Sequence, residues 1–130
     1  MRQSIAALTL VVRDYDEAIA WYTQKLGFEV LEDTAMGGVK RWVRIAPRGS
    51  TKTALLLAAA IGDGQSAAVG RQAGGRVFLF LHTDDFDRDY ASMRDAGVQF
   101  VETPRVEPYG KVVVFEDLYG NRWDFIEPSA

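Results

Sequence analysis

Two stretches of the chain repeat the same order of apolar and polar positions. Residues 8–16 and 79–87 each form an apolar run of strand length that ends in an Asp–aromatic–Asp step. An amphipathic helical pattern follows in both copies, then a glycine, then further strand patterns. The apolar positions at helical spacing are Tyr15, Ala18, Ile19, Tyr22 and Leu26 in the first copy, and Phe86, Tyr90, Met93 and Ala96 in the second. The chain is therefore predicted to contain an internal structural repeat.

The residues at the ends of both predicted helices fit helix boundaries. Asp14 is suited to an N-cap, and Glu17 three residues later completes a capping box. Asp85 is suited to the same role in the second copy, where Arg88 replaces the acidic partner. Gly27 and Gly97 stand where a C-terminal glycine takes a positive φ.

Strand patterns follow each glycine. We expect strands at 28–33, 40–46 and 53–58 in the first half, and at 99–102, 111–116 and 122–127 in the second. Residues 117–121 form the turn of the closing hairpin. The fold class is thus predicted to be α+β, with two βαβββ modules at about 4–58 and 76–128. Residues 59–75, with a helical turn within 65–72, are read as a linker inside one domain spanning 1–130, because neither half has enough core to fold alone.

Composition narrows the classes of protein to which the chain belongs. A length of 130 residues, 48% of them hydrophobic, suits one globular domain. The net charge of -3 argues against a nucleic-acid partner. The chain has no cysteine, which excludes disulfides and thiolate metal sites. Its longest apolar run, 54–61, is too short to span a membrane, and no signal-peptide pattern is present, so a cytoplasmic location is expected.

Several strings, in this order and spacing, resemble the glyoxalase / bleomycin resistance protein / dioxygenase (vicinal oxygen chelate) superfamily. The first is 12–18, VRDYDEA, followed by Trp21-Tyr22 and Leu26-Gly27-Phe28. The second is 95–98, DAGV. The third is the hairpin 115–124, FEDLYGNRWD, in which Leu118 stands in for the proline usual in this family. The resemblance covers nearly the whole chain. It implies curved mixed sheets around a cleft, and a homodimer in which modules pair either within one chain or across two.

The resemblance also implies where a metal would be held. Active members commonly place four ligands, one on the first and one on the last strand of each module, and these are mostly His and Glu. Here the positions fall on Ala7, on one of the leucines 55–57, on Phe78 and on Asp124. One carboxylate does not hold a catalytic metal. No cofactor is therefore expected; the alternative is one divalent metal ion in a shifted site built from His82, Glu116 and Asp124.

Side-chain alternation along the strands predicts a ligand-binding cleft with an apolar wall and a few polar groups. Its residues are Trp42, Arg44, Phe78, Phe80, His82, Glu116, Arg122 and Asp124. Glu116 and Asp124 are close enough in the predicted hairpin to form a carboxylate pair for acid–base chemistry. A plainer interpretation stays open, in which the aromatic rings fill the core and the carboxylates form the salt bridges Glu116–Arg122 and Asp124–Arg44. The loop around Tyr109 is read either as a lid or as an ordinary surface loop.

The first functional hypothesis is a metal-free protein that binds a small organic molecule in the cleft between modules. The alternative is a metal-dependent lyase, isomerase or dioxygenase with a non-standard metal site. A third possibility is a family member in which side chains fill the cleft, so that the protein binds no ligand. Catalytic residues are not assigned, and the expected partners are a small-molecule ligand and a second copy of the chain, with neither nucleic acid nor membrane.

Overall fold

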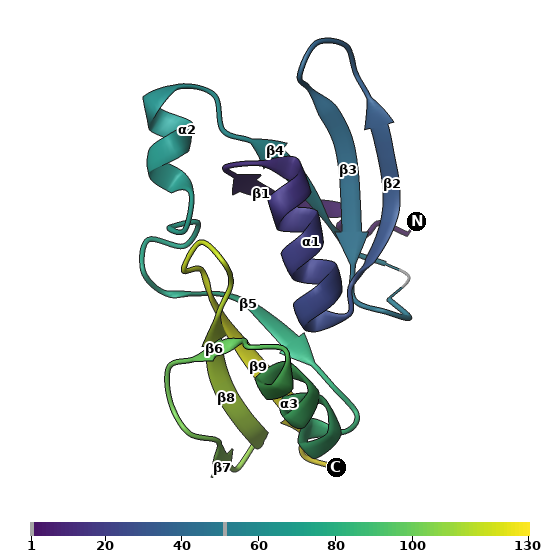
Figure 1. Cartoon of the computed structure of the whole chain (residues 1–130). Helices are drawn as coiled ribbons and strands as arrows, with labels where there is room; N and C mark the ends of the chain where they lie inside the picture. Colours follow the sequence, from purple (N-terminus) through teal and green to yellow (C-terminus); the bar gives the residue numbers. More distant parts are fainter. Residues whose placement is uncertain (1, 51) are drawn as a thin grey trace. The chain divides into compact units, whose positions relative to one another are not determined.

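The structure, a computed structural model, describes residues 2–50 and 52–130 and divides into two units, one ending at Val69 and one beginning at Gly70 (Figure 1). Each unit contains a strand, a helix packed on a mixed sheet, and further strands in the same chain order. The repeat and the α+β class predicted from the sequence are therefore confirmed.

The first unit contains a four-stranded sheet in the order β1-β4-β3-β2. Strand β1 pairs with β4 in parallel, and the other neighbours are antiparallel. Its elements are β1 Ala7–Val12, α1 Tyr15–Leu26, β2 Glu29–Ala35, β3 Arg41–Ala46, β4 Ala54–Ala59 and α2 Gly62–Ala68.

The second unit has the same arrangement with one short extra strand. Its sheet runs β5-β9-β8-β6, and β7 pairs with the first residues of β8, next to the stretch that pairs with β6. Strand β9 is parallel to β5 and antiparallel to β8, so it lies at the centre of the sheet. The elements are β5 Val77–His82, α3 Phe86–Asp95, β6 Gln99–Phe100, β7 Arg105–Glu107, β8 Gly110–Glu116 and β9 Arg122–Pro128.

The helix ends are built by the residues that the sequence indicated. Asp14 Oδ2 accepts a hydrogen bond from the backbone N–H of Glu17 at 2.8 Å, and Asp85 Oδ1 accepts one from Arg88 at 3.1 Å. Each bond satisfies a backbone donor that a helix N-terminus leaves without an intrahelical partner. Gly27 and Gly97 follow the two helices with φ of 72° and 89°, a backbone region that glycine adopts without steric cost.

In each unit the helix covers one face of the sheet. Tyr15, Ala18 and Tyr22 of α1 are buried together with the sheet residues Leu10, Val12, Val43, Ile45 and Leu57. In the second unit the ring of Phe86 on α3 lies 5.4 Å from that of Phe125, and Phe115 lies 5.8 Å from Trp123. Burying an aliphatic or aromatic side chain of this size stabilises a fold by roughly 1.5–3 kcal/mol.

The connection between the modules differs from the expectation. The helix within it is Gly62–Ala68, earlier than the expected turn, and the backbone N–H of Ile61 just before it donates to Gln65 Oε1 at 2.9 Å. Ala60 also donates from its backbone to Val12 at 2.8 Å. The first part of the predicted linker therefore belongs to the first unit.

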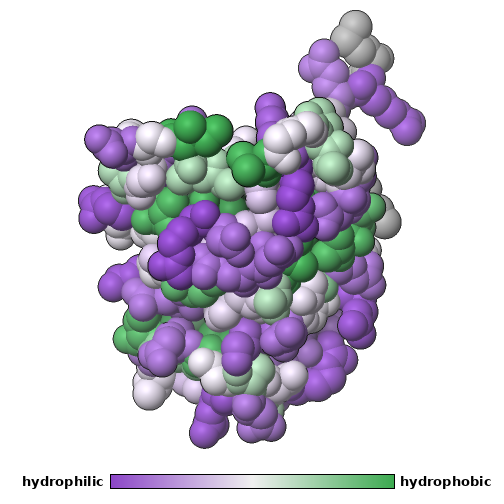
Figure 2. Space-filling model, turned by 45° about the horizontal axis from the view of Figure 1, so that its top comes forward, coloured by the Kyte–Doolittle hydropathy of each residue, from purple (hydrophilic) through white to green (hydrophobic). Residues whose placement is uncertain are grey.

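Not all apolar residues are buried, and hydrophobic patches interrupt the hydrophilic surface seen in Figure 2. Exposed large hydrophobic residues include Val39, Trp42, Phe80 and Val106. Among the described residues, no helix is long and apolar enough to cross a membrane.

Candidate functional site

The sheet of the second unit has one face that α3 does not cover, called here the helix-free face. The buried rings of Phe115, Trp123 and Phe125 point to the helix, so the alternating positions point the other way. The strand register places Asp124 of β9 between Phe80 of β5 and Val114 of β8. The residues of the helix-free face are Phe80, His82, Val112, Val114, Glu116, Arg122, Asp124 and Ile126.

Asp124 carries an unsatisfied oxygen at the centre of this face. Its Oδ1 atom is buried, and no hydrogen bond from the described residues reaches it. Burial raises the pKa of the Asp124 carboxyl above its ordinary value; Arg105 opposes this rise and Glu102 adds to it. A buried polar atom without a hydrogen bond is costly, and natural structures usually satisfy such atoms. Asp124 Oδ1 can therefore accept a further hydrogen bond.

Glu102 and Arg105, two neighbours of Asp124, were not among the residues chosen from the sequence. Glu102 Oε1 accepts a hydrogen bond from the backbone N–H of Val114 at 3.1 Å and one from Arg105 Nε at 3.2 Å. The Arg105 guanidinium also lies 3.3 Å from both the hydroxyl of Tyr109 and the carboxylate of Glu107. The alternating charges of Glu102, Arg105 and Glu107 could have indicated this cluster, but the neighbouring Pro104 and Pro108 suggested a surface loop.

Phe80, His82 and Phe78 were predicted to share one face of their strand. Phe80 is 62% exposed, and it lies with His82 on the helix-free face. A bulge between Val77 and Leu79 interrupts the alternation at Phe78, whose ring packs edge-on against Trp123 with centroids 6.5 Å apart. The expected placement of Phe78 depended on regular alternation, which the bulge breaks.

One of the two predicted salt bridges is present in the structure. Glu116 and Arg122 are cross-strand partners, and Oε2 of Glu116 lies 3.6 Å from Nε of Arg122, as the plainer interpretation expected. Arg44 instead donates to Glu32 Oε1 at 3.0 Å. The register shift between Val30 and Glu32 brings Glu32 opposite Arg44 across β2 and β3. Arg44 lies in the first unit and Asp124 in the second, so the bridge predicted between them stays a prediction.

Trp42 and Arg44 lie on β3 of the first unit, whereas the other six predicted site residues lie in the second. Arg44 pairs in register with Leu56, which in turn pairs with Thr9 on β1. These positions point away from the buried Leu55 and Leu57, so Leu56 is the leucine that shares a face with Ala7 and Thr9. Trp42 is 38% exposed.

The register shows that the residues at the expected metal positions do not fit a metal. They are Ala7, Leu56, Phe78 and Asp124, a set with one donor side chain. A metal site of this kind needs three or four His, Asp or Glu ligands. Across residues 2–50 and 52–130 no three His, Asp or Glu side chains converge as possible metal ligands, so His82, Glu116 and Asp124 do not form such a group there.

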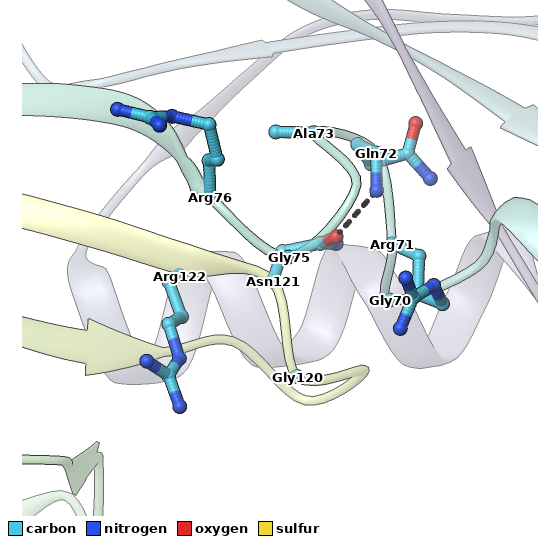
Figure 3. A pocket seen from close by; sticks show the side chains of 9 residues that line it. All are labelled: Gly70, Arg71, Gln72, Ala73, Gly75, Arg76, Gly120, Asn121 and Arg122. Atoms are coloured by element: carbon cyan, nitrogen blue, oxygen red, sulfur yellow. Dashed lines mark hydrogen bonds between the residues drawn. The ribbon is translucent and has the colours of Figure 1, made fainter.

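A small pocket of about 40 Å³ lies between the segment 70–76 and the β8–β9 turn (Figure 3). The backbone N–H of Gln72 donates to Asn121 Oδ1 at 3.3 Å and ties the segment to the turn. The side chains of Arg71, Arg76 and Arg122 point in different directions rather than into one centre (Figure 3). A pocket of about 40 Å³ is far smaller than the roughly 300–1,000 Å³ of small-molecule sites, so it does not suit an organic ligand.

The chain resembles proteins of one family over almost its whole length. A protein of Shewanella frigidimarina (strain NCIMB 400), itself uncharacterized, is 54% identical over 128 residues, which cover 98% of this chain and 95% of the relative. The crystal structure of UcmS2 superposes with a TM-score of 0.84 at 30% identity, covering 98% of this chain and 99% of that one. TnmS3, an antibiotic binding protein from Streptomyces sp. CB03234, has a TM-score of 0.78 at 28% identity, with 98% of both chains covered. Residues 4–125 match the sequence pattern of the Glyoxalase/Bleomycin resistance protein/Dioxygenase superfamily, and the chain therefore belongs to this superfamily.

Proposed function

We propose that the protein binds a small organic molecule, without a metal, on the helix-free face of its second unit. The observation that carries the proposal is the exposed ring of Phe80 beside the buried, unsatisfied oxygen of Asp124. An apolar surface with a few well-placed polar groups is the usual character of a small-molecule site. Val114 and Ile126 alternate to the same face but are buried, so Phe80 supplies most of its exposed apolar surface.

A relative supports binding rather than catalysis. TnmS3, at 28% identity over nearly the whole chain, is described as an antibiotic binding protein. The single donor among the four metal positions argues in the same direction, because the metal chemistry of the family requires several ligands. The protein would hold its ligand without changing it.

Other parts of the proposal come from the family resemblance and from composition. The chain forms a homodimer, an isologous arrangement common among proteins of this size, and it acts in the cytoplasm. A cleft between the modules remains a prediction. Light scattering of the purified protein measures the assembly directly: a mass near 28.8 kDa, twice the chain's 14.4 kDa, supports the dimer and 14.4 kDa contradicts it.

The proposed function is tested by thermal denaturation of chelator-treated protein against a panel of aromatic small molecules that includes antibiotics. A ligand that binds only the folded state raises the melting temperature. Phe80→Ala is expected to abolish the rise. Val106→Ala is the matched control, because Val106 is also exposed but alternates to the other face from Arg105, so the rise should persist. A rise that Phe80→Ala leaves intact would place binding elsewhere.

A further inference from the structure

We propose that the ligand carries a protonated nitrogen whose N–H donates to Asp124 Oδ1, attached to an apolar or aromatic body that lies on Phe80. This inference rests on the proposed function and narrows it from small organic molecules to organic amines.

The buried Oδ1 atom of Asp124 lacks a hydrogen-bond donor among the described residues. Arg105 is the nearby cation, but its guanidinium is already engaged by Glu102, Glu107 and the hydroxyl of Tyr109. A carboxylate accepts but does not donate when ionised. The group that completes this site must therefore bring an N–H or O–H of its own.

The charged side chains around Asp124 favour a cationic ligand. Three carboxylates, those of Glu102, Glu107 and Asp124, share the single guanidinium of Arg105 in this part of the sheet. Glu116 and Arg122, further along the same face, neutralise each other. The surplus charge around Asp124 is negative, which favours a cationic donor over a neutral one and disfavours an anion.

The neighbouring ring of Phe80 also favours a cationic ligand. Phe80 is the register partner of Asp124 on the adjacent parallel strand, so both side chains leave the same face of the sheet. The face of an aromatic ring attracts a cation electrostatically. The same ring, which is 62% exposed, offers apolar contact to the body of the molecule. Carboxylate and ring together match an amine attached to an aromatic or aliphatic group.

The test uses three probes that share one ring system and differ in one group: naphthylmethylamine, naphthylmethanol and naphthoate. Affinities are measured by protein-observed NMR titration at neutral pH with excess chelator. We expect the amine to bind about tenfold more tightly than the alcohol, since hydrogen bonds between charged groups are roughly twice as strong as neutral ones. Naphthoate should bind most weakly of the three.

Two variants then test whether the preference for the amine over the alcohol depends on the carboxylate of Asp124. Asp124→Asn should bind amine and alcohol with similar affinity. Asp95→Asn is the matched control, because it removes the same charge from an exposed residue of α3 and should keep the tenfold preference. The wild-type comparison of the three probes needs no variant, so the proposal can be tested even if Asp124→Asn folds poorly.

The outcomes separate this inference from the proposed function. If amine and alcohol bind equally and Phe80→Ala weakens both, binding on this face stands and the amine preference is wrong. Tighter binding of naphthoate, or a preference for the amine that survives in Asp124→Asn, also overturns the inference. If none of the probes shifts any resonance, this inference is overturned, and the thermal denaturation panel decides the proposed function separately.

Discussion

Phe80 and Asp124 are register partners on the parallel strands β5 and β9, so an exposed aromatic ring and a buried carboxylate oxygen leave the sheet side by side. A ligand that covers the exposed ring would remove apolar surface from water. The same ligand could donate a hydrogen bond to the oxygen, which has none from the described residues. The buried oxygen without a donor among these residues lowers the stability of the free protein, so its place beside an exposed ring supports a role in binding.

The first prediction is that Asp124→Asn stabilises the free protein at neutral pH, by up to about 1 kcal/mol, because it removes a partly buried charge without a hydrogen-bond donor at Oδ1. Chemical denaturation measures the change, and Asp95→Asn controls for loss of one surface charge. A lower stability for Asp124→Asn would mean that the carboxylate is satisfied in the free protein.

The second prediction concerns pH. Because burial raises the pKa of Asp124 in the folded state, the folded protein binds a proton there more readily than the unfolded chain does. Its contribution to stability therefore falls as pH rises from the unfolded value of about 3.8 through the raised folded value. The advantage of Asp124→Asn over the wild type should be largest above this window and shrink below it. An advantage that is independent of pH would contradict the assigned cause.

The third prediction concerns the contact between segment 70–76 and the β8–β9 turn. A Cβ on Gly70 would overlap the backbone carbonyl oxygen of Tyr119, and Gly70 has a φ of 79°. Gly74 has a similar φ of 64° but open space around it. We expect Gly74→Ala to cost about 1 kcal/mol for the backbone conformation alone, and Gly70→Ala about 2–4 kcal/mol because overpacking adds to it. Equal losses in urea denaturation would show that the steric contact is unimportant.

The fourth prediction concerns the turn itself. Asp117 is 5% exposed and accepts hydrogen bonds from the backbone N–H groups of Tyr119 and Asn121 and from Nδ2 of Asn121, each at 2.9 Å. Asp117→Ala should lower the free energy of unfolding by about 3 kcal/mol, because it leaves buried donors unsatisfied. Asp95→Ala, at an exposed position, should change it by less than about 0.5 kcal/mol. A small loss for Asp117→Ala would mean that water replaces the carboxylate.

The fifth prediction concerns metal content. Since only one of the four expected metal positions carries a donor side chain, protein purified without chelator should hold well below one metal ion per chain. Elemental analysis after incubation with zinc, nickel, iron or manganese measures this. About one ion per chain would support the alternative of a metal-dependent enzyme with an unusual site.

The regular elements were predictable because their signals are local. Asp14 and Asp85 indicate where the two helices begin, and Gly27 and Gly97 indicate where they end. Alternation of apolar and polar residues indicates the long strands. The predicted strand ends mostly agree with the structure to within one or two residues. The repeat itself needed only comparison of the chain with itself.

The site was less predictable because it depends on irregularities. The bulge at Phe78 and the register shift before Glu32 each change which side chains meet, and neither leaves a clear mark in the sequence. Strand β7 has three residues between prolines, too few for a period to show, so Arg105 and Glu102 were missed. The unsatisfied oxygen of Asp124 follows from the positions of all its neighbours, which only a structure supplies.

Metal-free binding on the helix-free face is tested most directly by NMR mapping of the tightest ligand from the compound panel, with and without excess chelator. We expect shifts centred on the amides of Phe80, Val114 and Asp124, and an affinity that chelator does not change. Shifts confined to other parts of the chain, or an affinity that disappears with chelator and returns with a divalent metal, would contradict it.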